Sequence, residues 1–215
     1  MPSGSLLSGF VAAALVVLVI PGPGVLYIVA RSLSQGRRAG LASVVGLAAG
    51  AYVHVAAAAI GLSAILLASA TAFGIVKVLG AGYLIYLGIQ TLLARRPLKK
   101  PDAPSPLPVY RLMMDGFIIS VFNPKIAVFF LAFLPQFIDP AAGSAAGQIW
   151  LLGLIYVGLA LVTDGAYAVL AGSVGHSLGR RGIIGALMQG SLPRYAVGGL
   201  YIGLGVNAAL TGRRN

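Results

Sequence analysis

Long stretches without a charged residue are the feature that most constrains this chain. Such runs are found at residues 1–30, 39–76, 78–94, 126–138, 140–163 and 195–212. Several exceed the ~20 residues that a helix needs to cross a bilayer. Only 9% of the 215 residues are charged, whereas roughly a quarter are charged in a soluble domain, and the mean hydropathy is +0.96. The sequence therefore predicts an all-α polytopic membrane protein.

The apolar pattern predicts six transmembrane helices, at residues 5–29, 39–68, 72–94, 112–136, 147–173 and 194–211. The basic residues between them lie on alternate loops, and they are Arg31, Arg37, Arg38, Arg95, Arg96, Lys99, Lys100, Arg111, Arg180, Arg181 and Arg194. The positive-inside rule places these loops in the cytoplasm and both termini outside. We therefore expect a multi-pass protein of the bacterial inner (cytoplasmic) membrane. Arg213 and Arg214 depart from the rule, since this topology leaves them outside.

A proline-rich stretch divides the chain into two halves. Residues 95–111 contain five prolines and no apolar periodicity, which predicts a cytoplasmic linker. Three helices precede it in residues 1–94, and three follow it in residues 112–215. An offset of 118 positions aligns Gly80 with Gly198 and Tyr83 with Tyr201. An odd number of spans in each half predicts two inverted three-helix repeats, which is a transporter architecture.

Two proline-containing blocks interrupt the predicted helices. The block PGPG (21–24) lies in the first span and NPK (123–125) lies in the fourth, at corresponding places in the two halves. Proline removes a backbone donor, so the freed carbonyls must face protein or a water-filled cavity rather than lipid. Asn123 is suited to cap the second half-helix, and Pro124 to begin it. Two broken helices indicate a midplane substrate site, where the amides of the half-helices favour a carboxylate.

Lys125 and Asp164 are the opposite charges expected deep in the membrane. Ionisable residues at such depth are functional candidates. Lys125 is placed to hold a substrate carboxylate or, alternatively, to bond the carbonyls of a helix end. Asp164 would bind a substrate ammonium or a transported proton, or it would neutralise Lys125. The predicted substrate-binding residues are Pro21, Gly22, Pro23, Gly24, Asn123, Pro124, Lys125 and Asp164.

His54 is a second candidate for proton coupling, together with Asp164. It follows Gly46 and Gly50 at a spacing of four, so it shares a face of small residues that lets helices pack closely. It would carry a proton near neutral pH or serve as a hydrogen-bonded packing residue. Secondary candidates nearer the helix ends are Lys77, Asp115 and Gln136.

A series of motifs extends over almost the whole chain. PGP at 21–23 is followed by GRRAGL at 36–41 and by G-xxx-G-xxx-H at 46–54. A pattern around Phe73–Gly88 and the stretch from NPK to FFLAFLPQF at 123–137 come next. In this order the motifs resemble the LysE/RhtB family of bacterial amino-acid exporters, and the resemblance also favours a role for Lys77. The family usually has asparagine after PGP, whereas this chain has Gly24.

These observations predict a secondary active exporter of amino acids or related small zwitterions. Protons would move in as substrate moves out, with alternating access around the PGPG and NPK breaks. The sequence contains no phosphate-binding loop, no cluster of metal ligands and no catalytic signature, so we predict neither an enzyme nor a cofactor. Two alternatives stay open. One is a non-transporting membrane scaffold or accessory subunit, and the other is a cation exporter that uses Asp164, His54 and Asn123.

The expected partners are an amino-acid substrate, protons and membrane lipid. The net charge is +11. We interpret the basic loop residues as topology signals and as contacts with anionic lipid headgroups, so we do not expect binding to nucleic acid. The 30 glycines would permit close packing of two copies in a homodimer.

Overall fold

The computed structural model describes residues 2–68 and 106–177 as continuous stretches. It also describes single positions at Thr71, Ile75, Val78, Gly82, Ile85, Tyr86, Ile89, Leu93, Ile202 and Val206. The longer helices are α1 (Gly4–Val19), α2 (Pro23–Gln35), α3 (Arg37–Ala68), α5 (Val109–Val121), α6 (Pro124–Val128) and α7 (Ala145–Ser177). A π-helix, η1 (Phe129–Phe133), continues α6, and two 3₁₀ segments follow, η2 (Leu134–Phe137) and η3 (Pro140–Ala142). The described residues contain no strand, as expected for an all-α protein.

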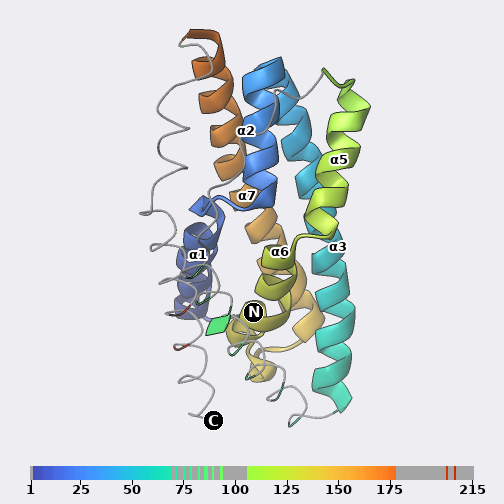
Figure 1. Ribbon diagram of the computed structural model, residues 1–215. Coiled ribbons are helices and arrows are strands. Elements are labelled where there is room, and N and C mark those ends of the chain that lie inside the picture. Colours follow the sequence, from blue (N-terminus) through green and yellow to red (C-terminus); the bar gives the residue numbers. More distant parts are fainter. Residues whose placement is uncertain are drawn as a thin grey trace.

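Four candidate membrane spans arise from these elements (Figure 1). Helices α3 and α7 are each long and apolar enough to cross a bilayer. The other two candidates are bent pairs: α1 and α2 meet at 52°, and α5 meets the segment from Pro124 to Phe137 at 46°. The prediction that the first and fourth helices are broken is therefore confirmed. The predicted spans at 72–94 and 194–211 lie largely outside the described residues.

Local chemistry sets where the half-helices begin and end. Pro23 occupies the first turn of α2, and Pro124 does the same in α6, where the Asn123 side chain caps the helix as predicted. Helix α2 passes the predicted end at residue 29 and stops at Gly36, whose φ of 83° favours glycine. Helix α5 begins at Val109, so the end of the predicted linker is helical.

Helix α3 packs against α5 at backbone contact. A Cβ atom at Gly46 would collide with the carbonyl of Met113, and one at Gly50 would lie 2.6 Å from the carbonyl oxygen of Phe117. From the other side, a Cβ at Gly116 would lie 2.7 Å from the carbonyl oxygen of Ser43. The small-residue stripe predicted on this helix is therefore a close helix–helix interface.

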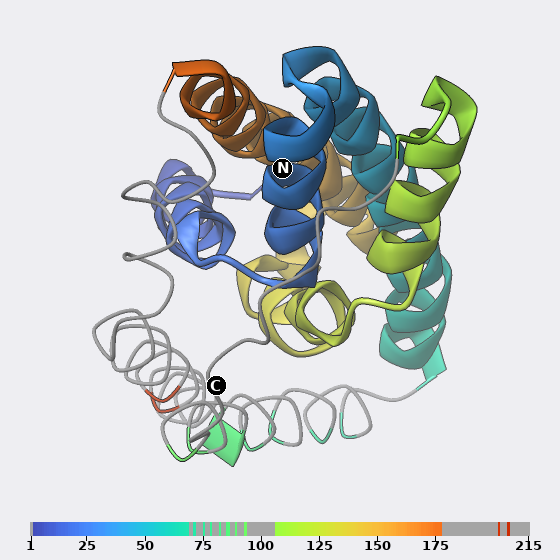
Figure 2. The same ribbon diagram turned by 45° about the horizontal axis from the view of Figure 1, so that its top comes forward.

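The basic ends of the described helices gather at one end of the bundle. Helix α2 ends there, and α3 and α5 begin there, as Figures 1 and 2 show. This arrangement places Arg31, Arg37 and Arg111 at the same end. The side chain of Gln35 joins the end of α2 to the segment that precedes α5, because its Nε2 donates to the carbonyl oxygen of Leu107 at 2.9 Å. The shared end agrees with the alternating charge pattern of the loops.

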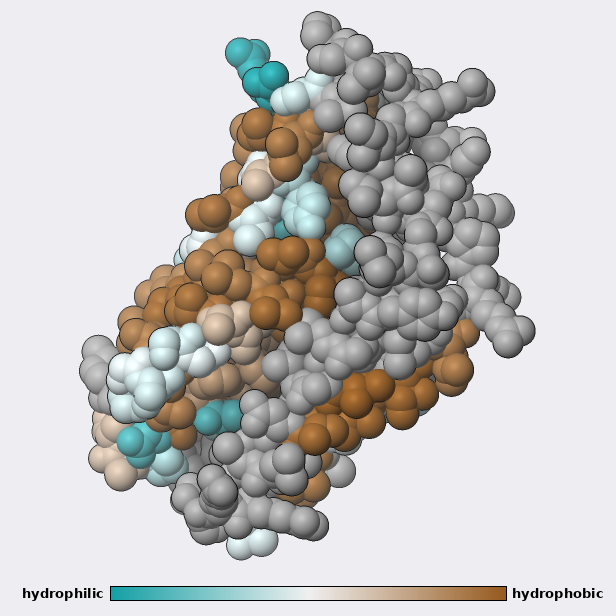
Figure 3. Space-filling view, turned by 90° about the vertical axis from the view of Figure 1, so that its left-hand side faces the viewer, coloured by the Kyte–Doolittle hydropathy of each residue, from teal (hydrophilic) through white to brown (hydrophobic). Residues whose placement is uncertain are grey.

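An aromatic cluster fills the other half of the bundle. It joins α1, the segment after α6, and α7, and its members are Phe10, Phe129, Phe130, Phe133, Phe137 and Tyr156. The closest pair, Phe129 and Tyr156, has ring centroids 4.5 Å apart. Apolar residues also cover much of the described surface in Figure 3. Ile60, for example, is 75% exposed, as expected for a chain that lipid solvates.

Candidate functional site

The two helix breaks lie against each other in the bundle. The Nζ atom of Lys125, at the start of α6, donates to the carbonyl oxygen of Ile20 at 2.6 Å. Ile20 is the residue that ends α1, so its carbonyl is one that the first break frees. Gly22 permits this approach, because a Cβ there would lie 3.2 Å from Cδ of Lys125. The predicted meeting of the breaks in the bundle is therefore observed.

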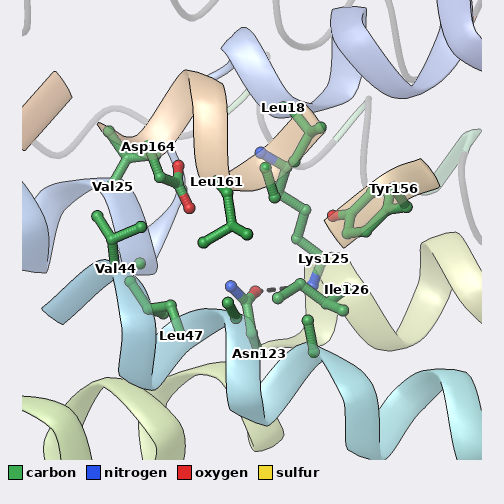
Figure 4. A pocket seen from close by; sticks show the side chains of 15 residues that line it. Leu18, Val25, Val44, Leu47, Asn123, Lys125, Ile126, Tyr156, Leu161 and Asp164 are labelled. Carbon is green, nitrogen blue, oxygen red and sulfur yellow. Dashed lines mark hydrogen bonds between the residues drawn. The ribbon is translucent and has the colours of Figure 1, made fainter. Parts of the chain in front are cut away.

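A cavity of about 40 Å³ lies between the breaks. Gly22 and Gly24 line it from the first break, Asn123 and Lys125 from the second, and Asp164 from α7. The predicted prolines Pro21, Pro23 and Pro124 are not among the lining residues, and their contribution is to shape the backbone. Figure 4 shows the Lys125 side chain extending across the site, with Asp164 projecting into it from another helix.

Lys125 and Asp164 share the cavity without a direct bond. Within the described part of the chain, the Asp164 carboxylate accepts no hydrogen bond and forms no salt bridge with Lys125. The ammonium group instead bonds a helix-end carbonyl, which is one of the two roles weighed for it above. Asp164 is half-buried, and a carboxylate in such surroundings without a bonded partner is an expensive arrangement. Such a group is well suited to accept a cationic ligand or a proton.

The two half-helices present different N-terminal ends to the cavity. In α6 the backbone amide of Lys125 donates to Oδ1 of Asn123 at 3.0 Å, so this amide already has a partner. In α2 no side chain caps the first turn, and Leu26 N is the amide that bonds back to Gly22 O. The preceding amides of Gly24 and Val25 have no acceptor within the helix. An anion is therefore favoured at the start of α2, next to Lys125.

Two further side chains bond the carbonyls that the breaks expose. The hydroxyl group of Tyr167, on α7, donates to the carbonyl oxygen of Val19 at 2.7 Å. Nε2 of His54, on α3, donates to the carbonyl oxygen of Ser120 at 3.0 Å. His54 is thus a hydrogen-bonded residue within the bundle, one of the two roles weighed for it, and it does not line the cavity. Its predicted proton-coupling role stays a prediction.

Tyr167 was missed by the sequence analysis. The available signal was its position three residues after Asp164, since residues at that spacing share a helix face. That spacing does not reveal the bonded carbonyl of Val19, because the contact depends on how α7 packs against α1.

The secondary candidates lie away from the cavity. Asp115 is near the basic end of the bundle, where the Tyr27 hydroxyl group donates to its Oδ2 at 3.4 Å. Gln136 bonds within its own segment, with Nε2 donating to the carbonyl oxygen of Ala132 at 3.1 Å. Lys77 lies outside the described residues. The described residues also contain no group of three His, Cys, Asp or Glu side chains that could hold a metal ion.

Comparison with known proteins gives a family. Residues 15–210 match the family model described as LysE type translocator. The chain belongs to the LysE family of translocators. This LysE-type chain is 34% identical to a homoserine/homoserine lactone efflux protein of Salmonella typhimurium, over 70% of its own length and 73% of the relative.

Two further relatives of this LysE-type chain carry names that describe them as membrane proteins. One from Vibrio cholerae is 34% identical over 77% of this chain and 80% of the relative. Another from Bacillus subtilis is 30% identical over 73% of this chain and 78% of the relative. No solved structure matches the chain. The family membership and the apolar helices establish a polytopic membrane transport protein.

Proposed function

We propose that this LysE-type translocator is a secondary active exporter of amino acids or similar small zwitterions in the bacterial inner membrane. The observation that carries the proposal is the pair of unlike charges, Lys125 and Asp164, that line one cavity at two helix breaks without bonding each other. The name of the Salmonella relative supports an efflux role. The substrate would be a small molecule with both an ammonium and a carboxylate group.

The cavity offers one place for each charged group of a zwitterion. The carboxylate would lie between Nζ of Lys125 and the uncapped amides of Gly24 and Val25 at the start of α2. Charge-assisted hydrogen bonds of this kind are stronger than neutral ones. The ammonium group would bind the carboxylate of Asp164. This arrangement recognises the backbone groups that all amino acids share.

Binding and conformational change would be linked through Lys125. In the described state the cavity holds about 40 Å³, which is room for about three water molecules at ~10–15 Å³ each. An amino acid therefore requires the site to widen. A substrate carboxylate would take the ammonium group away from the carbonyl of Ile20, a contact that joins the two broken helices. The loss of that contact would free the helices to rearrange in an alternating-access cycle between two inverted repeats.

Proton coupling is assigned to Asp164, with His54 as the second candidate. Asp164 cannot hold a proton and a substrate ammonium with equal ease, because protonation removes the charge that attracts the ammonium. A proton arriving from outside would therefore release the substrate. Opposite movements of proton and substrate follow from this competition.

An efflux assay tests the proposal. Cells lacking the gene and cells expressing it are loaded with individual amino acids, and the appearance of each in the medium is measured with and without a protonophore. We expect expression to accelerate efflux of at least one amino acid, and the protonophore to abolish the gain. If expression accelerates the efflux of no amino acid, the scaffold alternative is favoured. If expression accelerates efflux equally with and without the protonophore, proton coupling is overturned.

A further inference from the structure

Aliphatic side chains form the part of the cavity that the charged pair leaves open. Val25 comes from α2, Val44 and Leu47 from α3, and Leu161 from α7. Figure 4 shows these four, here called the aliphatic wall, on the side of the site where Asp164 projects. A substrate whose ammonium group binds Asp164 therefore places its side chain against or near this wall.

Leu47 reaches into the cavity because position 24 is glycine. A Cβ atom at Gly24 would lie 2.9 Å from Cδ2 and 3.6 Å from Cδ1 of Leu47. A carbon atom at that separation from Cδ2 would force the leucine to move. The leucine thus occupies the space next to the α2 start that a longer residue at 24 would take, and it makes that surface apolar. Positions 24 and 47 jointly set the shape and polarity of the wall.

Charge in the cavity is limited to the pair already assigned. Among the lining residues that the structure describes, Lys125 and Asp164 are the ionisable ones besides Tyr156. In the binding arrangement proposed above, the substrate carboxylate and ammonium occupy both. A second charge on the substrate side chain would then face the aliphatic wall without a partner, and burial of an unpaired charge is strongly unfavourable. An uncharged aliphatic side chain would gain from the same contact.

We propose that the aliphatic wall restricts this exporter to amino acids with uncharged aliphatic side chains, and that Leu47 is a specificity-determining residue. The proposal rests on the proposed function, since it takes the two charges of the site as those that bind the substrate backbone groups. Lysine, arginine, aspartate and glutamate are excluded as substrates. A hydroxyl group on the side chain is disfavoured to a smaller extent, because it loses water without losing a charge.

Transport by the purified protein in proteoliposomes tests the selectivity. Counterflow of radiolabelled alanine, valine, leucine, serine, lysine and aspartate is measured separately. We expect valine or leucine to be taken up best, and lysine and aspartate more than about 100-fold less efficiently, because an apolar pocket already rejects an added hydroxyl group by about that factor. Comparable uptake of lysine or aspartate would overturn the wall proposal and leave the exporter intact. No uptake of any amino acid would overturn the proposed function, and the wall proposal with it.

Variants of Leu47 test the role of that residue. Leu47→Ala enlarges the cavity, so the ratio of leucine to alanine transport should rise by roughly 10-fold, at the low end of the range for a change of one methylene group. Leu47→Asp places a carboxylate on the wall and should allow lysine to enter, whereas Leu47→Asn should not. Leu41→Ala is the matched control, because Leu41 is on the same helix, is 42% exposed and does not line the cavity.

The outcomes of these variants are distinct. An unchanged leucine-to-alanine ratio in Leu47→Ala, with the protein eluting as a single species in detergent, would remove Leu47 from the specificity assignment. The same shift in Leu41→Ala would do so too. If the Leu47 variants fail to fold, the wild-type selectivity for charged substrates still decides the proposal.

Discussion

The two helix breaks both contain proline, but they differ in which groups form hydrogen bonds with their backbone. At the second break, Asn123 caps α6 with its own side chain, and its backbone amide donates to Ser120 O at 3.1 Å. At the first break, no side chain caps α2, and the carbonyls of Val19 and Ile20 are bonded by side chains from other helices. The second break is mostly self-contained, whereas the first depends on tertiary contacts.

This difference suggests which break responds to substrate. A carbonyl that is bonded from within its own segment keeps its partner when neighbouring helices move. A carbonyl that is bonded by a side chain of another helix can lose that partner when the helices move. An unsatisfied carbonyl in the hydrocarbon interior of a membrane costs on the order of several kcal/mol. The first break therefore depends on Lys125 and Tyr167 for the donors that bond its carbonyls. Substrate or proton binding near Lys125 would act on the first break more than on the second.

The largest effect is expected from removing both charges of the site. Lys125→Met combined with Asp164→Asn leaves no lone charge in the bundle, so it should still insert and purify, with some loss of stability because Ile20 O loses its donor, yet efflux should fall to the background of cells without the gene. Efflux and the yield of monodisperse protein are measured together. Near-normal export would refute the site assignment and leave the exporter function standing. Lys125→Arg is the companion variant that keeps a donor for Ile20 O.

The next effect concerns the donor from α7 to the first break. Tyr167→Phe removes the hydroxyl group that bonds Val19 O. Val19 is 56% exposed and belongs to a predicted membrane span, so lipid would leave its carbonyl unsatisfied, which should lower the free energy of unfolding by about 1–3 kcal/mol. Denaturation of the purified protein in detergent measures the change. Tyr110→Phe is the control, since Tyr110 is 70% exposed on α5. Equal stability of the two variants would show that the first break does not need this donor.

A smaller effect is expected at the cap of the second break. Asn123→Ala should cost about 1 kcal/mol of stability, as for other N-cap residues, and Asn123→Ser or Asn123→Asp should restore most of it. The same denaturation experiment compares the three. If alanine costs more than the loss of Tyr167 does, the second break is the more dependent one and the comparison above is reversed.

The smallest structural effect is expected at His54. The carbonyl of Ser120 also accepts from the backbone amide of Asn123, and a glutamine amide can still donate to it, so His54→Gln should cost no more than about 0.5 kcal/mol of stability, the low end of the net contribution of a hydrogen bond. Efflux at several external pH values is measured alongside. We expect His54→Gln to reduce proton-driven efflux less than Asp164→Asn does. The opposite order would make His54 the main proton carrier.

Much of the fold and part of the site could be predicted from sequence, for local reasons. Uncharged runs mark the spans, and the proline-containing blocks PGPG and NPK favour a break within such a run, so both bent helices were predictable. The cap by Asn123 is also a local property. For the ammonium group of Lys125, the sequence left three possible partners: a substrate carboxylate, the carbonyls of a helix end, or Asp164. Which one it bonds depends on the packing of α6 against α1, as does the role of Tyr167.

The irregular course after α6 was equally hard to predict. The sequence indicated a helix up to residue 136, but η1 and η2 replace the regular α-helix from Phe129. Pro135 accounts for part of this, because it has no amide to continue the helical hydrogen bonds. The aromatic packing of Phe129 and Phe133 then fixes the segment. No feature of the sequence alone indicates how the helix adapts.

The glycine contacts between α3 and α5 bear on how the molecule can move. At Gly46 and Gly116 the two backbones lie in direct contact, and at Gly50 the side chain of Ser120 joins the contact, so we expect little room for one helix to slide along the other. The two helices belong to different predicted repeats, so this interface would hold the two repeats against each other. We expect movement in the helices that pack around this pair. Helix α2, for example, meets α3 at Gly24 through the side chain of Leu47. In a transport cycle, α3 and α5 would stay together, while the bent first span would move and open the cavity to one side of the membrane or the other.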